Sequence, residues 1–377
     1  MMHRLSDSIN RLSPVTEYRI VHRLSGHDGY VKSAALTETD GASQLVGVNG
    51  SGEVWMWDLR RGDCSQLSLS LDAAAPDEEW FREHGLLDEH DDEVDDEYDE
   101  YDDEDGDAVG DASEIVDSLV VAEIDAQRVL VTGGSRFDLA FYDEDQMGGA
   151  LRVWDLRTGR KLGRTMTGHG LGVTSMAVVA SERGPLSVSS SEEGTLLAWD
   201  LTSGQLVSRL EGSYNGAMGA ANIGGRPIAV TGGHDDHLEA WDILAGQKIA
   251  TLPGVEEGAG VVALTELGGR GVVVAGCGDR TLRMWDVATQ DQIGPPRTGH
   301  PEQVDRIAVV RIGGRTVAVT GSSDGTRLWD LSQGDQIGNT LVDHQFLLAA
   351  ELAGSPVVVT DGPDQTVHVW DVTSAGR

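Results

Sequence analysis

Short runs of alternating apolar and polar residues recur along most of the chain and predict β-strands. Apolar, β-branched runs at 272–275 and 317–320 follow the tight turns Gly268-Gly269-Arg270 and Gly313-Gly314-Arg315. Gly-Gly pairs take the positive φ angles that a two-residue hairpin turn requires. The alternation continues at 282–285, where successive side chains would point to opposite faces of a strand. The pattern therefore predicts an all-β chain of short antiparallel strands.

A Trp-Asp pair recurs seven times and sets the period of these strands. The tryptophans are Trp57, Trp154, Trp199, Trp241, Trp285, Trp329 and Trp370. The last five intervals are 41 to 45 residues long, and the first, of 97, equals one period plus an insertion. A fixed period of this length is typical of radial repeat architectures with about four strands per unit. We therefore expect a seven-bladed β-propeller with four-stranded antiparallel blades.

These repeats resemble the WD-repeat family over roughly residues 17 to 372. The resemblance implies a tetrad in each blade: a Trp of the third strand, an Asp of the preceding turn, a hydroxyl residue of the second strand, and a His before the first. Buried polar groups must be paired, and such a chain would pair all of its members. The last two repeats offer full structural tetrads, His300, Thr320, Asp324 and Trp329, then His344, Thr360, Asp364 and Trp370.

Other repeats depart from this tetrad. Tyr214 and Glu256 stand at the histidine position, Ser51 and Glu193 at the aspartate position, and Ala275 at the hydroxyl position. We expect packing to hold those blades more than hydrogen bonds do.

The two ends of the chain are expected to close the ring. Only six residues follow Asp371, too few for a fourth strand, whereas the strand-like run 18–24 precedes the first repeat. We expect this run to complete the last blade, which would remove the open sheet edges. The expected organisation is a flexible arm at 1–16, the propeller at 17–372 with an acidic disordered insertion at 72–114, and a tail at 373–377.

Charge is concentrated in the first of two insertions. The formal net charge is −35, and residues 72–112 hold 21 Asp and Glu against the single base Arg82. A second, shorter acidic insertion lies at 135–148, and in a propeller both would emerge from the same face. The like-charge block 88–105 is typical of disordered segments. It is either a solvated loop without a binding role, a segment that attracts a basic partner by its charge, or a weak binder of divalent cations. The ligand spacing of a calcium-binding loop does not fit this segment.

We predict a non-catalytic scaffold that binds a basic protein partner through this face. The candidate partner-binding residues are Asp91, Asp92, Asp95, Asp96, Tyr98, Tyr101, Asp102, Asp103, Glu192 and His234. Gly278, Ser323 and Pro363 would line the same face near the channel. Trp55, where other repeats carry mostly polar residues, is either a further contact or a packing residue. The alternatives are a metal- or small-molecule-binding enzyme at the channel mouth, or an acidic mimic of nucleic acid.

The remaining features restrict the chemistry and the location. Sets of Ser, His and Asp recur once per repeat, which favours a structural role over a catalytic one, and no catalytic residue, metal or cofactor is predicted. In the cluster 233–237, Asp235 is better used as a tetrad residue than as a metal ligand. The strong acidity disfavours nucleic acid and anionic membranes as partners. The two cysteines, Cys64 and Cys277, and the lack of a membrane-length apolar run favour the cytoplasm.

The sequence leaves the oligomeric state open. Arg outnumbers Lys by 25 to 3, which is the codon usage expected of a GC-rich, bacterial genome.

Overall fold

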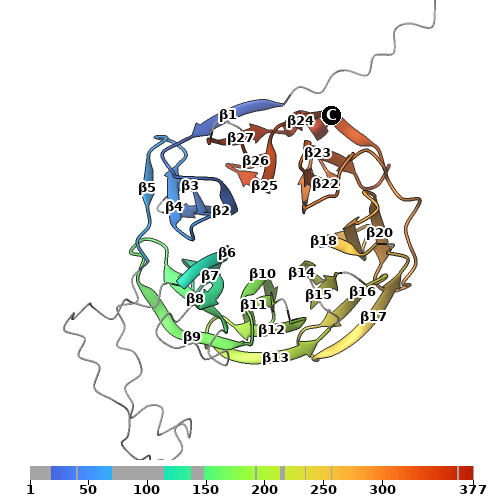
Figure 1. Ribbon diagram of the computed structural model, residues 1–377, viewed down its shortest axis with the longest axis horizontal. Coiled ribbons are helices and arrows are strands. Elements are labelled where there is room, and N and C mark those ends of the chain that lie inside the picture. The colour runs from blue at the N-terminus through green and yellow to red at the C-terminus, as the bar shows by residue number, and fades with distance from the viewer. Residues whose placement is uncertain are drawn as a thin grey trace, which may run out of the picture.

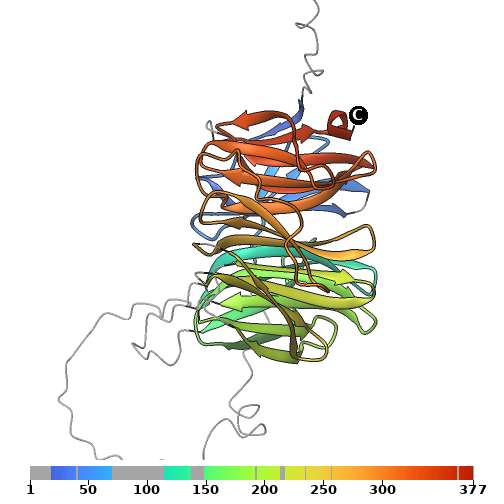
Figure 2. The ribbon, with the colours of Figure 1, turned by 90° about the vertical axis from the view of Figure 1, so that its right-hand side faces the viewer.

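Seven antiparallel sheets surround a central channel, as Figure 1 shows for the computed structural model. The structure describes residues 18–39, 41–69, 114–136, 148–191, 193–212, 217–233, 235–255, 257–362 and 365–376. In side view the blades form a thick disc (Figure 2). The predicted seven-bladed, all-β fold is confirmed. Within the described residues no helix is long and apolar enough to cross a membrane.

We letter the strands of each blade a to d from the channel outwards. Blade 1 contains β2 (Val31–Thr39), β3 (Ala42–Asn49), β4 (Val54–Asp58) and β5 (Cys64–Gln66). Blade 2 contains β6 (Glu114–Ile124), β7 (Gln127–Arg136), β8 (Gly149–Asp155) and β9 (Lys161–His169). Blade 3 contains β10 (Val173–Ser181), β11 (Gly184–Ser191), β12 (Thr195–Asp200) and β13 (Gln205–Glu211). Blade 4 contains β14 (Ala217–Ile223), β15 (Arg226–Gly232), β16 (His237–Asp242) and β17 (Gln247–Pro253).

Blades 5 and 7 differ from the others in how strand d is made, whereas blade 6 is regular. Blade 5 contains β18 (Ala259–Leu267), β19 (Arg270–Cys277) and β20 (Leu282–Asp286). Blade 6 contains β21 (Arg306–Ile312), β22 (Arg315–Ser322), β23 (Gly325–Asp330) and β24 (Gln336–Val342). Blade 7 contains β25 (Gln345–Leu352), β26 (Ser355–Asp361), β27 (Val367–Asp371) and, as its strand d, β1 (Arg19–Leu24). The short 3-10 helix η2 (Thr373–Gly376) follows β27.

Blade 5 refines the expectation of four full strands. Opposite β20 the chain forms only two isolated bridges, Leu282 with Arg297 and Trp285 with Gln292. Pro295 and Pro296 lie between the bridge partners, and proline has no backbone N–H to donate to a ladder. The fourth strand of this blade is therefore interrupted rather than absent.

The ring closes where the sequence predicted. β1 pairs antiparallel with β27 over Arg19–Leu24, opposite Val367–Asp371, so one sheet joins both ends of the described chain. Leu24 is buried in the contact between blades 7 and 1.

The predicted hairpin turns and the Trp-Asp pairs explain the local structure of every blade. Gly224 and Gly225 have φ of 57° and 86°, as a two-residue turn of this twist requires. The aspartate of each pair caps the turn that follows strand c; for example, Asp330 Oδ1 accepts hydrogen bonds from the backbone N–H groups of Ser332 (2.9 Å) and Gln333 (3.2 Å). Similar bonds hold the pKa of Asp155 below its ordinary value, although burial opposes them.

The core is divided among the seven junctions between neighbouring blades. Seven separate clusters of buried apolar residues lie there, and each contains the tryptophan of one Trp-Asp pair. All seven indoles are at most 9% exposed. Burial of such large rings against the preceding blade is what joins the blades into a ring.

Candidate partner-binding face

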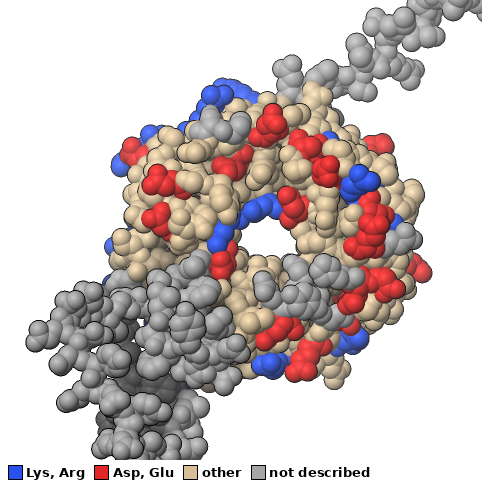
Figure 3. Space-filling view, in the orientation of Figure 1, with Lys and Arg blue, Asp and Glu red and all other residues tan. Residues whose placement is uncertain are grey.

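One face of the ring is strongly acidic in its described loops. Strand a leaves this face and strand b returns to it, so the d–a and b–c connections all lie there. Their described residues carry a single base, Arg280, against eleven acids: Asp28, Glu53, Glu193, Asp235, Asp236, Glu257, Asp279, Glu302, Asp305, Asp324 and Asp343. Figure 3 looks onto this face and shows acidic side chains over much of it. We call it the acidic face.

The opposite face is electrically balanced. The described a–b and c–d connections carry five acids, Asp63, Asp125, Glu182, Asp291 and Asp335, and five bases, Arg60, Arg61, Arg157, Arg160 and Arg183. The acidity of the folded ring is therefore one-sided, independently of the acidic insertion. An asymmetric field of this kind can orient an approaching charged molecule.

Most of the predicted partner-binding residues lie outside the described residues. These are Asp91, Asp92, Asp95, Asp96, Tyr98, Tyr101, Asp102, Asp103, Glu192 and His234, together with Pro363 and the tetrad residue Asp364. Gly278 and Ser323 are described and lie in the b–c connections of blades 5 and 6, on the acidic face.

Blade 6 brings its four tetrad residues together just beneath the acidic face. The Thr320 hydroxyl lies 2.7 Å from His300 Nε2 and accepts a hydrogen bond of 2.8 Å from Trp329 Nε1. Asp324 is not bonded directly to His300, because its Oδ1 lies 3.6 Å from His300 Nδ1. Ser322 lies between the two: its hydroxyl donates its single proton to Asp324, and its oxygen lies 3.0 Å from Nδ1. The hydrogen-bonded link between Asp324 and His300 is made by another residue, which the sequence pattern did not include.

Arg327 makes this link in blade 6, and it fixes the protonation of the histidine. Its Nη1 lies 2.9 Å from both His300 Nδ1 and Asp324 Oδ1. A guanidinium has no acceptor, so Nδ1 must accept and the ring proton must lie on Nε2. Burial, followed by the charge of Arg327, lowers the pKa of His300 to about 4. The hydrogen bonds from Arg327 and Ser322 outweigh burial and lower the pKa of Asp324 to about 2.

In the other blades the indole N–H finds different acceptors. Where a threonine is present it accepts, at 2.8 Å in blade 2 (Thr132), 3.2 Å in blade 4 (Thr231) and 2.9 Å in blade 7 (Thr360). Where Ala275 or Gly47 replaces it, the indole donates to a backbone carbonyl before strand a, Pro253 or Ser25. Trp199 Nε1 of blade 3 has no acceptor among the described residues. Substitution at the hydroxyl position is thus compensated by the backbone in two blades.

Three further histidines, His27, His169 and His344, occupy the tetrad position with altered surroundings. His169 Nε2 lies 2.8 Å from the Ser189 hydroxyl, and Glu193, at the aspartate position, accepts from the Gly170 N–H at 2.9 Å. Burial lowers the pKa of His169 to about 4. His344 packs against Trp370 in an edge-on contact with ring centroids 5.0 Å apart.

The mouth of the channel on the acidic face is lined by charged residues of the inner strands. Lys32 and Asp117 each occupy a position where the a–b register shifts by one residue, in blades 1 and 2. Lys32 Nζ donates to Asp117 Oδ1 at 2.6 Å across the blade boundary, and the Ser135 hydroxyl donates to Asp117 Oδ2 at 3.2 Å. Arg306, at the start of β21, is half-buried there. None of these residues was predicted as a site residue. Their charges near the start of strand a, a position that lines the channel, could have indicated them.

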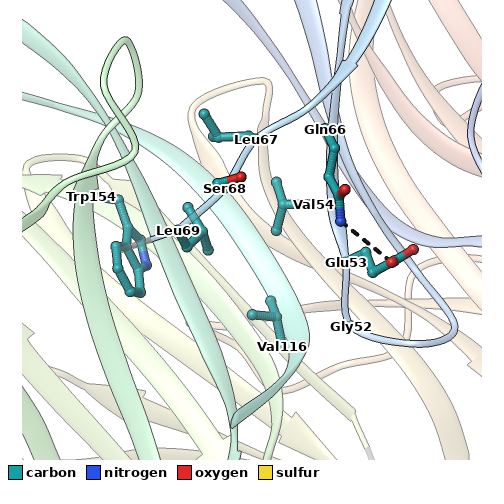
Figure 4. A pocket seen from close by; sticks show the side chains of 9 residues that line it. All are labelled: Gly52, Glu53, Val54, Gln66, Leu67, Ser68, Leu69, Val116 and Trp154. Atoms are coloured by element: carbon teal, nitrogen blue, oxygen red, sulfur yellow. Dashed lines mark hydrogen bonds between the residues drawn. The ribbon is translucent and has the colours of Figure 1, made fainter. Parts of the chain in front are cut away.

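A small cavity of about 230 Å³ lies between blades 1 and 2 (Figure 4). Val54, Leu69, Val116 and Trp154 form its apolar wall, and on one side the Gln66 amide donates to Glu53 at 3.3 Å. It holds no set of convergent titratable groups. Nothing in its lining indicates a reaction.

Trp55 packs rather than faces a partner. The side chain is half-buried in the apolar cluster between blades 7 and 1, alongside Leu24 and Trp57. Of the two roles considered for this residue, the geometry favours local packing.

No cluster suited to a metal ion occurs in the part of the chain that the structure describes. There, no three His, Cys, Asp or Glu side chains converge as ligands. His237 Nδ1 lies 3.2 Å from Asp236 Oδ1, and Glu239 is bonded to Lys248 at 2.8 Å. His234 of the same sequence cluster lies outside the described residues.

The seven sheets and their repeated buried networks define a β-propeller. A comparison with protein families matches the model of the WD40 repeat, "WD domain, G-beta repeat", over residues 160–200. The match runs from strand d of blade 2 through strand c of blade 3. The chain matches no curated protein. The matched repeat, within a ring of seven blades, supports a WD-repeat β-propeller, a fold that commonly mediates protein–protein interaction.

Proposed function

We propose that this propeller is a non-catalytic scaffold that binds a basic protein partner on its acidic face. The observation that carries the proposal is the contrast between eleven acids and one base on that face and an even balance on the other. Complementary charge speeds encounter and selects the partner's orientation. In the sequence the acidic residues 72–112 lie between strand d of blade 1 and strand a of blade 2, and the d–a connections described elsewhere in the ring belong to the acidic face. The two cysteines support a reducing, cytoplasmic setting.

Exposed apolar side chains supply contact area within the charged field. Three large, exposed apolar side chains lie in or next to d–a connections: Tyr30 is 59% exposed, Leu171 41% and Val342 61%. Aromatic and aliphatic anchors of this kind carry much of the affinity of an interface, while the charged rim tunes its rate. The partner we expect is therefore basic with apolar residues interspersed.

The test compares two variants with the same change in net charge. One replaces Asp235, Asp236, Glu302 and Asp343 on the acidic face by their amides, and the other replaces Asp125, Glu182, Asp291 and Asp335 on the opposite face. We expect partner capture from an extract of the source cells to fall in the first variant only, and to weaken as salt rises. If both variants lost partner capture equally, the net charge of the protein and not the acidic face would explain the loss, and the proposal would be wrong. If neither variant lost capture, the proposal would also be wrong.

The contribution of the acidic insertion is measured separately. Replacing residues 88–105 by a neutral Gly/Ser linker removes the like-charge block and leaves the blades intact. Under the proposal this variant captures the partner more slowly and with a weaker salt dependence. Capture unchanged in rate and salt dependence would assign the block to solubility alone.

A further inference from the structure

The acidic face has a basic centre. Among the strands a, which line the channel, Lys32 and Arg306 are the only Lys or Arg residues at the end that opens on this face. Figure 3 shows Lys and Arg atoms along one side of the central hole, inside a face that is otherwise mostly acidic or uncharged. An attractive point for anions therefore lies at the middle of a surface that repels them.

The Arg306 guanidinium keeps its hydrogen-bonding capacity. It makes no hydrogen bond or ion pair with any residue that the structure describes, although it feels the charges of Asp305, of Asp361 in blade 7 and of Tyr30 in blade 1. The surrounding protein lowers the pKa of Arg306 through burial, which means that water reaches the group only in part. An arginine has five N–H donors, and a partly dehydrated one gains most from a bidentate anionic acceptor.

The neighbours of Arg306 complete the arrangement. Lys32 uses one of its three N–H groups for Asp117, which leaves two for another acceptor. Tyr30 is 59% exposed and is held in place by the hydrogen bond from the Gly50 N–H to its own carbonyl at 3.1 Å. The Arg306 guanidinium, the Lys32 ammonium with two N–H groups still unbonded among the described residues, and the exposed Tyr30 ring thus lie at the same end of the channel.

We propose that the channel mouth binds a single carboxylate side chain of the partner through Arg306 and Lys32. This inference rests on the proposed function, since it places the carboxylate at the centre of a basic surface that covers the acidic face. A carboxylate is favoured over a phosphate because Asp305, Asp361 and Asp117 lie nearby, and each added negative charge is repelled by them. The partner's charge pattern is then the inverse of this face.

Two capped peptides test the proposal directly. Both alternate lysine and glycine, one with a central glutamate and the other with glutamine, and binding is followed by fluorescence anisotropy at low salt. General steering favours the glutamine peptide, which has the higher positive charge. The proposal expects the glutamate peptide to bind about threefold or more tightly to the wild type, as a charge-assisted bidentate contact allows. The preference should vanish in Arg306→Gln.

Arg280→Gln is the matched control, because Arg280 lies on the same face but donates to the Pro301 carbonyl at 3.0 Å. It should keep the preference for glutamate. A tighter glutamine peptide in the wild type, or a glutamate preference that survives Arg306→Gln, would overturn the carboxylate site while leaving the proposed function standing. Salt-independent binding of both peptides would instead count against the proposed function.

A measurement without any basic partner separates the two ideas further. The Nε–H signal of Arg306, assigned by its loss in Arg306→Gln, is followed by NMR during titration with a capped Gly-Glu-Gly peptide, with its Gly-Gln-Gly counterpart and with inorganic phosphate. The proposal expects a saturable shift with the glutamate peptide and none with the glutamine peptide. No shift, or tighter binding of phosphate than of glutamate, would refute it.

Discussion

Acidification should destabilise the ring through its buried, neutral tetrad histidines. Burial lowers the pKa of both His169 and His300 from 6.5 to about 4. Between about pH 6.5 and pH 4 these histidines are protonated in the unfolded chain but neutral in the folded protein. Protonation therefore favours the unfolded chain, and the stability present above about pH 6.5 is lost as pH falls towards 4. Each histidine then removes about 2 kcal/mol by pH 5, or about 4 kcal/mol for the pair, out of the roughly 5–15 kcal/mol typical of folded proteins.

In His300 the loss has a visible cause. Arg327 Nη1 donates to Nδ1 at 2.9 Å, and a protonated Nδ1 would place two donors and two positive charges face to face. Protonation therefore requires Arg327 to leave, which also releases its bonds to Asp324.

The assay is urea unfolding, followed by tryptophan fluorescence at about pH 7.5 and about pH 5, for the wild type and for the double variant His169→Gln/His300→Gln. The double variant starts less stable but should lose about 4 kcal/mol less over this interval. Thr202→Val, an exposed substitution that removes no titratable group, is the control and should keep the wild-type slope. A double variant with the wild-type pH dependence, or tetrad histidines that titrate near 6.5 by NMR, would refute the reasoning.

Three further substitutions or deletions test the fold. Thr320→Val should lower the free energy of unfolding by about 2–3 kcal/mol, because it leaves the His300 and Trp329 donors without their acceptor. The exposed control Thr202→Val should change it by less than about 0.5 kcal/mol in the same urea titration. Gly325→Ala should lower the free energy of unfolding by more than about 2 kcal/mol, since φ is 132° and the new Cβ would overlap the Leu341 carbonyl oxygen. Gly268→Asn is the control: φ is 59°, the space around it is open, and calorimetry should show almost no change in stability. Deleting residues 17–25 should open the ring and lower Tm by about 10 °C or more, and an unchanged Tm would show that β1 is dispensable.

The fold could be predicted from the sequence because its signals repeat. Each tryptophan of the Trp-Asp pairs fills one junction between blades, and each aspartate caps one turn, so a local pattern implied a global ring. The strand that closes the ring was also predictable, since Val367–Asp371 would otherwise have ended a blade without its outer strand. The interruption of blade 5 was less visible, although Pro295 and Pro296 were a signal for it.

The surroundings of individual charged side chains could not be predicted from the sequence, for a physical reason. Arg306 and Arg327 are separated by only 21 residues and look alike in sequence, yet one is bonded into a tetrad and the other lies open at the channel. Whether the N–H donors of each arginine find acceptors depends on residues from other blades and other turns. The acidic character of one face, by contrast, follows from loop order alone, because alternate connections in an antiparallel blade lie on the same side.

The pairing of β1 with β27 sets the order of events during synthesis. The seventh sheet takes its outer strand from residues 19–24 and its other strands from residues 345–371, so the sheet cannot be assembled until the ribosome has translated nearly all of the described chain. Earlier blades can form as they emerge, because their strands are contiguous. Until then β1 is a waiting strand without a neighbour, and a nascent chain halted late in translation would be an open arc rather than a ring.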